Sequence, residues 1–127
     1  MIFELNQIIE KTIKIYEKSP CTIEELSQTI LNLKAKKIIP YNELAKNALL
    51  ARGYIWKNGL SRQYWLDFSE LVGIHWKILS YLFDVAVSGE DVDVNRFRYE
   101  YRGKKIDVLK LPIGKQREHW FCHNHFT

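Results

Sequence analysis

The C-terminal residues of this sequence hold the side chains best suited to binding a metal or transferring a proton. Four nitrogen or sulfur donors, His119, Cys122, His123 and His125, stand within seven positions. These residue types suit Zn²⁺ or Cu²⁺, and histidine titrates close enough to neutral pH to serve as an acid or a base. Two candidate sites follow: a metal site made of all four residues, and a catalytic site made of the three histidines.

The spacing of these donors suits neither site well. Structural zinc sites usually join two ligand pairs across a longer loop, whereas all four donors here crowd one short segment. On a strand, alternation would turn His119, His123 and His125 to one side and Cys122 to the other. A third β-strand over 118–126 that closes the core with its aromatic residues explains the same segment. We therefore expect no cofactor and a non-enzymatic protein, with a small histidine-dependent ribonuclease toxin as the catalytic alternative.

A basic hairpin is predicted over residues 96–111. Arginine alternates with aromatic residues up to Arg102, and Gly103-Lys104 supplies a two-residue turn with glycine first. In that register Tyr101 pairs with Ile106. The aromatic and aliphatic residues would then cover the helices, and most of the Arg and Lys residues would share the accessible face.

Charge is segmented along the chain. Residues 34–62 hold seven Lys or Arg and one acid (7 − 1 = +6), residues 67–93 hold one lysine and six acids (1 − 6 = −5), and residues 96–117 hold eight Lys or Arg and two acids (8 − 2 = +6). Two basic blocks around an acidic one could form a face that binds a polyanion. The alternative is that the acidic block neutralises the basic ones within the fold.

These features favour a small binding protein that contacts nucleic acid or a nucleoprotein partner. Arginine presents planar, bidentate donors suited to phosphate and carboxylate, and aromatic rings stack on bases or anchor interfaces. The heavy aromatic load and the acidic block also fit a protein–protein inhibitor of the immunity or anti-defence type. The candidate contact residues are Arg96, Arg98, Arg102, Lys104, Lys105, Lys115, Arg117, Arg62, Trp56 and Trp65.

Helical patterns fill the first two thirds of the chain. Apolar residues at three- and four-residue spacing predict helices over 2–18 and 22–33, and Thr22 with Glu25 forms a capping box for the second. A third helix is predicted to start near Pro40 and to stop at Gly53.

The segment after Gly53 is predicted as a short strand, 54–59, with an Asn-Gly turn. A helix over 67–87 follows, apolar nearly all round and hence expected at the centre of the domain. The second and third helices loosely match a helix-turn-helix, which would expose Asn42, Lys46, Asn47 and Arg52.

The expected fold is one α+β domain spanning 1–127. About four N-terminal helices, 1–89, precede a small antiparallel β-sheet, 94–127, as the length suits a single core. The first residues lack the positive charge of a signal peptide, and the longest apolar segment, 74–87, is too short and too charged to span a bilayer. With two distant cysteines, we expect a reduced cytoplasmic protein that contacts no membrane.

Overall fold

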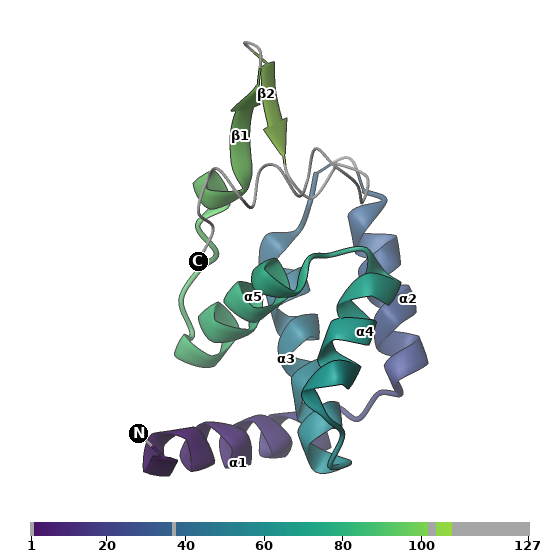
Figure 1. Cartoon of the computed structure of the whole chain (residues 1–127), viewed down its shortest axis with the longest axis vertical. Helices are drawn as coiled ribbons and strands as arrows, with labels where there is room; N and C mark the ends of the chain where they lie inside the picture. Colours follow the sequence, from purple (N-terminus) through teal and green to yellow (C-terminus); the bar gives the residue numbers. More distant parts are fainter. Residues whose placement is uncertain (1, 37, 102–103, 108–127) are drawn as a thin grey trace. The chain divides into compact units, whose positions relative to one another are not determined.

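The computed structural model describes residues 2–36, 38–101 and 104–107. This part of the chain contains five α-helices, followed by the 3-10 helix η1 (Val94–Phe97) and the strands β1 (Arg98–Tyr101) and β2 (Lys104–Asp107) (Figure 1). The chain divides into two compact units, Met1–Val92 and Asp93–Thr127, and each is described by itself. The helices, all in the first unit, are α1 (Ile2–Lys18), α2 (Ile23–Lys34), α3 (Tyr41–Lys57), α4 (Arg62–Val72) and α5 (Trp76–Ser88).

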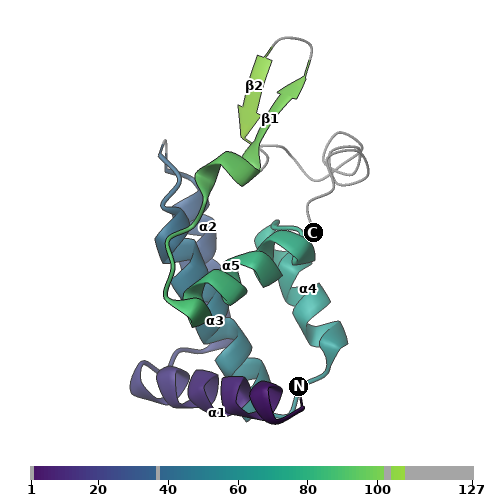
Figure 2. The ribbon, with the colours of Figure 1, turned by 90° about the vertical axis from the view of Figure 1, so that its left-hand side faces the viewer.

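The central helix of the first unit is α3. It packs against α1, α2, α4 and α5 (Figure 2), and its buried residues Leu44, Ala48, Ala51 and Ile55 recur at three- and four-residue spacing. A single central helix was predicted over residues 67–87; the segment instead forms two helices, of which α5 packs extensively against α3.

The predicted first and second helices are confirmed by α1 and α2. Thr22 is the N-cap of α2: its hydroxyl oxygen accepts a hydrogen bond from the Glu25 amide at 3.1 Å, as the capping-box spacing indicated. The apolar residues that follow, Leu26 and Ile30 among them, are each 1% exposed. Local sequence signals therefore define α2 completely.

Helix α3 runs past Gly53, where a stop was predicted, and replaces the strand predicted over 54–59. Ile55 is 1% exposed, so the buried face of the helix continues beyond the glycine. The helix ends instead at Gly59, whose φ of 64° lies in the left-handed region and whose amide donates to the Trp56 carbonyl at 3.2 Å.

The helix predicted over 67–87 is two helices joined by a sharp corner. Gly73, at φ 68°, ends α4, and His75 begins α5 by accepting a hydrogen bond from the Lys77 amide on Nδ1 at 3.2 Å. Lys34, at the end of α2, donates from Nζ to the Val72 and Gly73 carbonyls at 2.8 Å each. The side chain of one helix thus satisfies carbonyls that the end of another leaves unpaired.

The corner also bears on membrane insertion. Within the described ranges, no single helix combines the length and the apolar character needed to cross a bilayer. Taken together, α4 and α5 have the length and composition of a membrane span, but the two helices are bent by 104° relative to each other.

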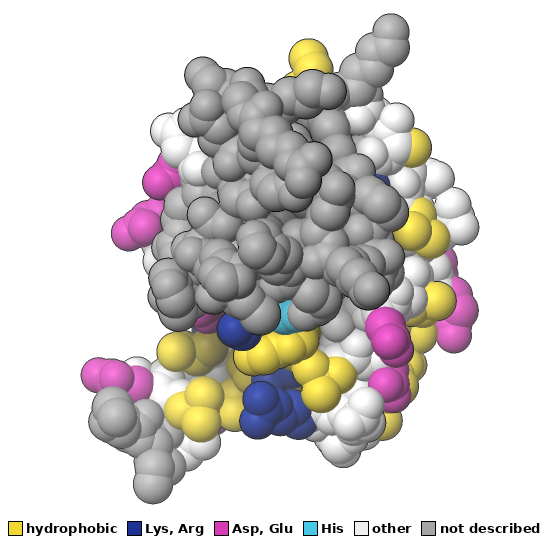
Figure 3. Space-filling model, turned by 45° about the horizontal axis from the view of Figure 1, so that its top comes forward, with side chains coloured by type: hydrophobic (Ala, Val, Ile, Leu, Met, Phe, Trp, Pro, Cys, Tyr) yellow, Lys and Arg dark blue, Asp and Glu magenta, His cyan; other side chains and the backbone are white. Residues whose placement is uncertain are grey.

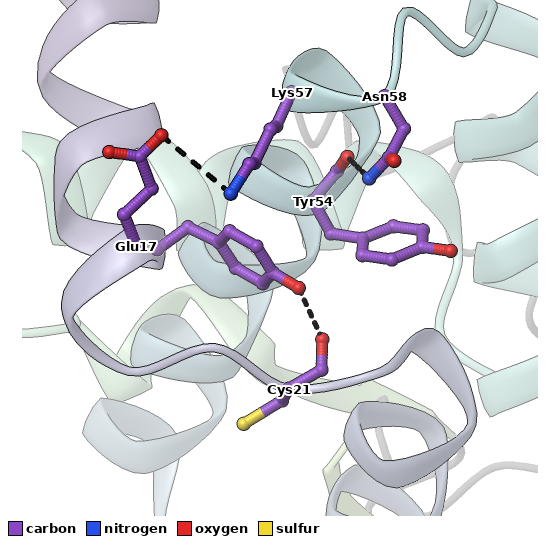
Figure 4. Close-up of polar contacts among 6 residues, drawn as sticks. Glu17, Cys21, Tyr54, Lys57 and Asn58 are labelled. Atoms are coloured by element: carbon purple, nitrogen blue, oxygen red, sulfur yellow. Dashed lines mark hydrogen bonds and ion pairs between the residues drawn. The ribbon is translucent and has the colours of Figure 1, made fainter.

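Helices α1 and α3 cross closely at Gly53. A Cβ atom on Gly53 would lie 2.6 Å from the Tyr16 Cβ and 3.0 Å from the Thr12 carbonyl oxygen. Beside the crossing, the Tyr16 hydroxyl donates to the Cys21 carbonyl, and Lys57 Nζ lies 3.7 Å from Glu17 Oε1 (Figure 4). Burial of the phenol raises the pKa of Tyr16.

Thr12, on α1 at this crossing, is 1% exposed, and its hydroxyl has no hydrogen-bond partner among the residues that the structure describes. Replacing Thr12 by valine should therefore raise the free energy of unfolding by up to about 1 kcal/mol, because an unsatisfied buried hydroxyl is removed. Urea denaturation measures the change. Thr29→Val is the control, since the exposed Thr29 hydroxyl donates to the Glu25 carbonyl; a Thr12→Val variant less stable than the wild type would contradict the expectation.

The second unit begins with η1, where the sequence predicted a strand from residue 96. Asp93 Oδ1 accepts a hydrogen bond from the Asn95 amide at 3.1 Å, which starts a turn rather than a strand. The strands β1 and β2 pair antiparallel with Tyr101 opposite Lys104, whereas Ile106 was predicted opposite Tyr101. The observed register differs from the predicted one by two residues. Because side chains alternate with a period of two, this shift leaves unchanged which residues share a face of the hairpin.

The fold of the described residues up to 88 is all-α. The helical part of the α+β prediction is therefore confirmed in its class, with five helices where about four were expected. The return of the hairpin over 108–111 and the third strand over 118–126 lie outside the described residues, and the sheet as a whole stays a prediction.

Candidate binding groove and tryptophan platform

A groove of about 400 Å³ opens between α1, α3, α4 and α5. We call it the Arg52 groove. Its walls are mainly apolar and aromatic, and its polar side chains are Arg52, Ser80, Asp84 and Ser88. The full lining is Leu5, Ile8, Arg52, Trp56, Trp65, Ser80, Phe83, Asp84, Val87 and Ser88.

Two tryptophans hold the guanidinium of Arg52. Its Cζ lies 4.9 Å from the ring centroid of Trp56, four residues on along α3, and 4.9 Å from that of Trp65 on α4. Both contacts are cation–π interactions. Burial lowers the pKa of Arg52, and the nearby positive charge of Arg62 lowers it further. Such a shift marks a cation that the protein does not neutralise.

No carboxylate of the described residues forms an ion pair with Arg52. The groove has one acid of its own, Asp84 on α5, which has neither an ion pair nor a hydrogen bond within that part of the chain. More than a third of Asp84 is exposed, yet the apolar surroundings raise the pKa of its carboxyl. The groove therefore presents a cation and an acid that are not paired with each other.

The aromatic walls are fixed by contacts of their own. Trp56 meets Phe83 of α5 edge to face, with ring centroids 5.5 Å apart. Trp65 donates from its indole nitrogen to Ser80 Oγ at 3.2 Å and is 4% exposed. These contacts tie α3 and α4 to α5, so Arg52 is held against rings that have little room to move.

A second cluster lies on the corner between α4 and α5. We call it the Trp76 platform; it consists of Arg62, Trp76 and Lys77. The partly buried ring of Trp76 has the Arg62 Cζ at 5.9 Å and the Lys77 Nζ at 5.7 Å from its centroid. Neither cation makes an ion pair with another described residue. The ring of His75 stacks on Trp76 at 5.6 Å.

Figure 3 shows one face of the molecule on which Lys and Arg side chains lie among hydrophobic ones. This mixture is what the Arg52 groove and the Trp76 platform share: a cation set against an aromatic ring, without an acid to neutralise it. Such surfaces can hold anions that also carry flat or apolar parts.

The structure distributes the predicted contact residues over several places. Trp56 and Trp65 line the Arg52 groove, and Arg62 belongs to the Trp76 platform. The remaining residues predicted for partner binding fall in the second unit: Arg96, Arg98, Lys104 and Lys105 have described backbones, whereas Arg102, Lys115 and Arg117 lie outside the described residues.

The candidate metal and catalytic residues, His119, Cys122, His123 and His125, also lie outside the described residues. Within the ranges that the structure describes, no group of three or more His, Cys, Asp or Glu side chains is arranged to hold a metal ion.

The structure agrees with only part of the helix-turn-helix interpretation: Asn42 and Lys46 are exposed as predicted, whereas Asn47 and Arg52 are partly buried. Arg52 lies in the groove rather than on a free face. Asn42 is also committed elsewhere: its Oδ1 accepts from the Val92 amide at 3.0 Å, and its Nδ2 lies 3.4 Å from Asp91 Oδ1. The helix that carries both, α3, is central in its unit and buries most of its surface.

Phe83 and Asp84 are site residues that the sequence did not point to, and Arg52 was expected only on the exposed face of a helix-turn-helix. The spacing of Arg52 and Trp56, four residues apart, would have brought them together on a continuous helix, but the helix was expected to stop at Gly53. Trp76 lies in the segment predicted as one helix over 67–87, and in the structure it follows the corner before α5 and lies near Arg62.

No protein-family model matches the chain, and no curated protein or solved structure is significantly similar to it. The Arg52 groove and the Trp76 platform are thus the features on which function can be argued.

Proposed function

We propose that this chain is a small non-enzymatic binding protein that holds single-stranded nucleic acid, free or in a nucleoprotein complex, on the Trp76 platform. The observation that carries the proposal is the ring of Trp76 with two cations near it, Arg62 and Lys77, that make no ion pair with another described residue. Proteins that bind single strands combine stacking of bases on aromatic rings with cations that follow the phosphates. The platform has both parts.

The predicted hairpin would be a second contact rather than the first. Its backbone register sets Arg98 opposite Asp107 and Glu100 opposite Lys105, so residues of opposite charge type occupy opposing positions. Over β1 and β2, three cations stand against two acids (3 − 2 = +1). Within residues 96–117, any larger basic surface of a full α+β fold would have to come from the five other cations, Arg96, Arg102, Lys110, Lys115 and Arg117.

The proposal predicts that Arg62→Ala/Lys77→Ala weakens binding of a fluorescently labelled single-stranded RNA at least tenfold. Each lost phosphate contact should also lower the slope of log affinity against log salt by about 0.7, or about 1.4 for the pair. Fluorescence anisotropy across a salt series measures both quantities. Trp76→Leu should also weaken RNA binding, but it should leave the salt slope nearly unchanged, since it removes base stacking and no charge.

Lys14→Ala/Lys18→Ala is the matched control, because it removes the same charge from exposed positions of α1. Equal effects of the two double variants would mean that only net charge matters, which would refute a binding site on the platform. A wild-type protein that does not bind RNA at low salt would also refute the proposal. The alternative hypothesis, binding to a protein partner, would then be favoured. The probe is run on a gel afterwards to check that it stays intact.

A further inference from the structure

The Arg52 groove contains a charge that the described protein leaves unbalanced. Arg52 is partly buried against two indole rings, burial and Arg62 lower its pKa, and no described carboxylate pairs with it. A guanidinium keeps its charge at any physiological pH. Partial burial of this cation is therefore unfavourable, and no ion pair with a described residue offsets it. An anion entering the groove would supply that missing partner.

We propose that the Arg52 groove is a separate ligand site for a small monoanion with a flat, apolar body, such as an aromatic carboxylate or sulfonate. This site goes beyond nucleic-acid binding on the Trp76 platform and does not depend on it. The anionic group would lie against the Arg52 guanidinium, and the apolar body would lie along Trp56, Phe83 and Val87.

The size and lining of the groove favour a small ligand over a polymer. A volume of about 400 Å³ falls in the range of small-molecule pockets, which are mostly apolar with a few placed polar groups. A nucleic-acid strand would need several cations in sequence, whereas Arg52 is the one cation in the lining. A helix from a protein partner would need a longer apolar channel than ten lining residues provide.

The two charged side chains define which anion fits. The rings of Trp56 and Trp65 lie against the guanidinium, so an anion approaches the in-plane N–H groups, a geometry that suits two oxygens of one carboxylate or sulfonate. Asp84 lines the same groove and would repel a second negative charge. A monoanion is therefore preferred over a phosphate dianion.

The test uses two dyes that share one ring system. Anilinonaphthalene sulfonate is a flat apolar monoanion whose fluorescence rises on binding, and phenylnaphthylamine has the same rings without the sulfonate. Both are titrated against the full chain and its variants by fluorescence. We expect the wild type to bind the sulfonate dye at least tenfold more tightly than the neutral dye.

The variants locate the site. Arg52→Met keeps an apolar side chain and removes the charge, so it should weaken binding of the sulfonate dye at least tenfold and leave the neutral dye within twofold. Asp84→Asn should tighten binding of the sulfonate dye severalfold, because it removes the like charge from the groove. Lys46→Met, which removes an equal charge from an exposed position of α3 outside the lining, is the matched control and should change dye affinity less than threefold.

Three results would overturn the proposal: equal affinity of the wild type for the two dyes, sulfonate affinity unchanged in Arg52→Met, or a larger loss of sulfonate affinity in Lys46→Met than in Arg52→Met. If circular dichroism shows that Arg52→Met does not fold, Asp84→Asn decides, and unchanged sulfonate affinity in that variant refutes the site. Loss of RNA binding in Arg62→Ala/Lys77→Ala with dye binding retained would support both sites independently.

Discussion

Replacing Gly53 by alanine is expected to lower the free energy of unfolding by about 2 kcal/mol, although alanine is the better helix former by roughly 1 kcal/mol. The added Cβ would lie 2.6 Å from the Tyr16 Cβ and 3.0 Å from the Thr12 carbonyl oxygen. Neither atom is the end of a flexible side chain, so α1 must move away from α3. Overpacking usually costs about 1–3 kcal/mol, and a Cβ contact as short as 2.6 Å belongs at the upper end, about 3 kcal/mol, which leaves about 2 kcal/mol after the helix-forming gain of roughly 1 kcal/mol.

Thermal unfolding followed by circular dichroism measures the effect of Gly53→Ala, and a destabilisation of about 2 kcal/mol corresponds to a fall in Tm of roughly 10 °C in a domain near 100 residues. Lys46→Ala, at an exposed position of the same helix, is the control and should leave Tm nearly unchanged. If Gly53→Ala instead melted at a higher temperature than the wild type, the two helices could not cross as closely as the structure has them.

Replacing Lys34 by methionine should cost about 2 kcal/mol of stability. Its ammonium donates to the Val72 and Gly73 carbonyls at 2.8 Å each, and hydrogen bonds from a charged donor contribute roughly 1.5–3 kcal/mol. The loss leaves two carbonyls at the end of α4 with one donor fewer, next to residues that are buried, such as Val72 at 0% exposure.

Urea denaturation of Lys34→Met against Lys36→Met makes a matched comparison, since both variants lose one lysine from the end of the same helix and Lys36 is exposed. The expected result is a lower midpoint for Lys34→Met alone. Equal midpoints would show that the fold requires neither hydrogen bond and that water replaces the ammonium at no net cost.

The sequence predicted best where the signal was local. The capping box at Thr22 and Glu25 located the start of α2, because both partners stand within one helical turn. Glycine was harder to interpret. Gly53 and Gly59 are both glycines and stand six positions apart, yet Gly53 lies inside α3 and Gly59 follows its C-terminal end. What separates them is Tyr16, which needs the missing Cβ and belongs to a helix far away in the sequence.

The site was less predictable for the same reason. The group of Trp56, Arg62 and Trp65 was identified from residue types, but the structure assigns Arg62 to a different cluster from the two tryptophans. The count of cations in residues 34–62 also overstated what a partner could meet. Lys34 bonds to the end of α4, and Lys57 pairs with Glu17. Charge counts carry no information about such tertiary commitments.

The corner between α4 and α5 also sets the entropy of assembling the Arg52 groove. The contact from Trp65 to Ser80 closes a loop of 15 residues, whereas Ile8 and Arg52, which both line the groove, are 44 residues apart (52 − 8 = 44). Closure entropy grows as (3/2)RT ln n, so the roughly threefold longer loop costs about 1 kcal/mol more. Closing the groove with α1 is therefore the step with the larger loss of chain entropy. We therefore expect local unfolding to release α1 before it separates the rings around Arg52, which belong to one continuous stretch of chain.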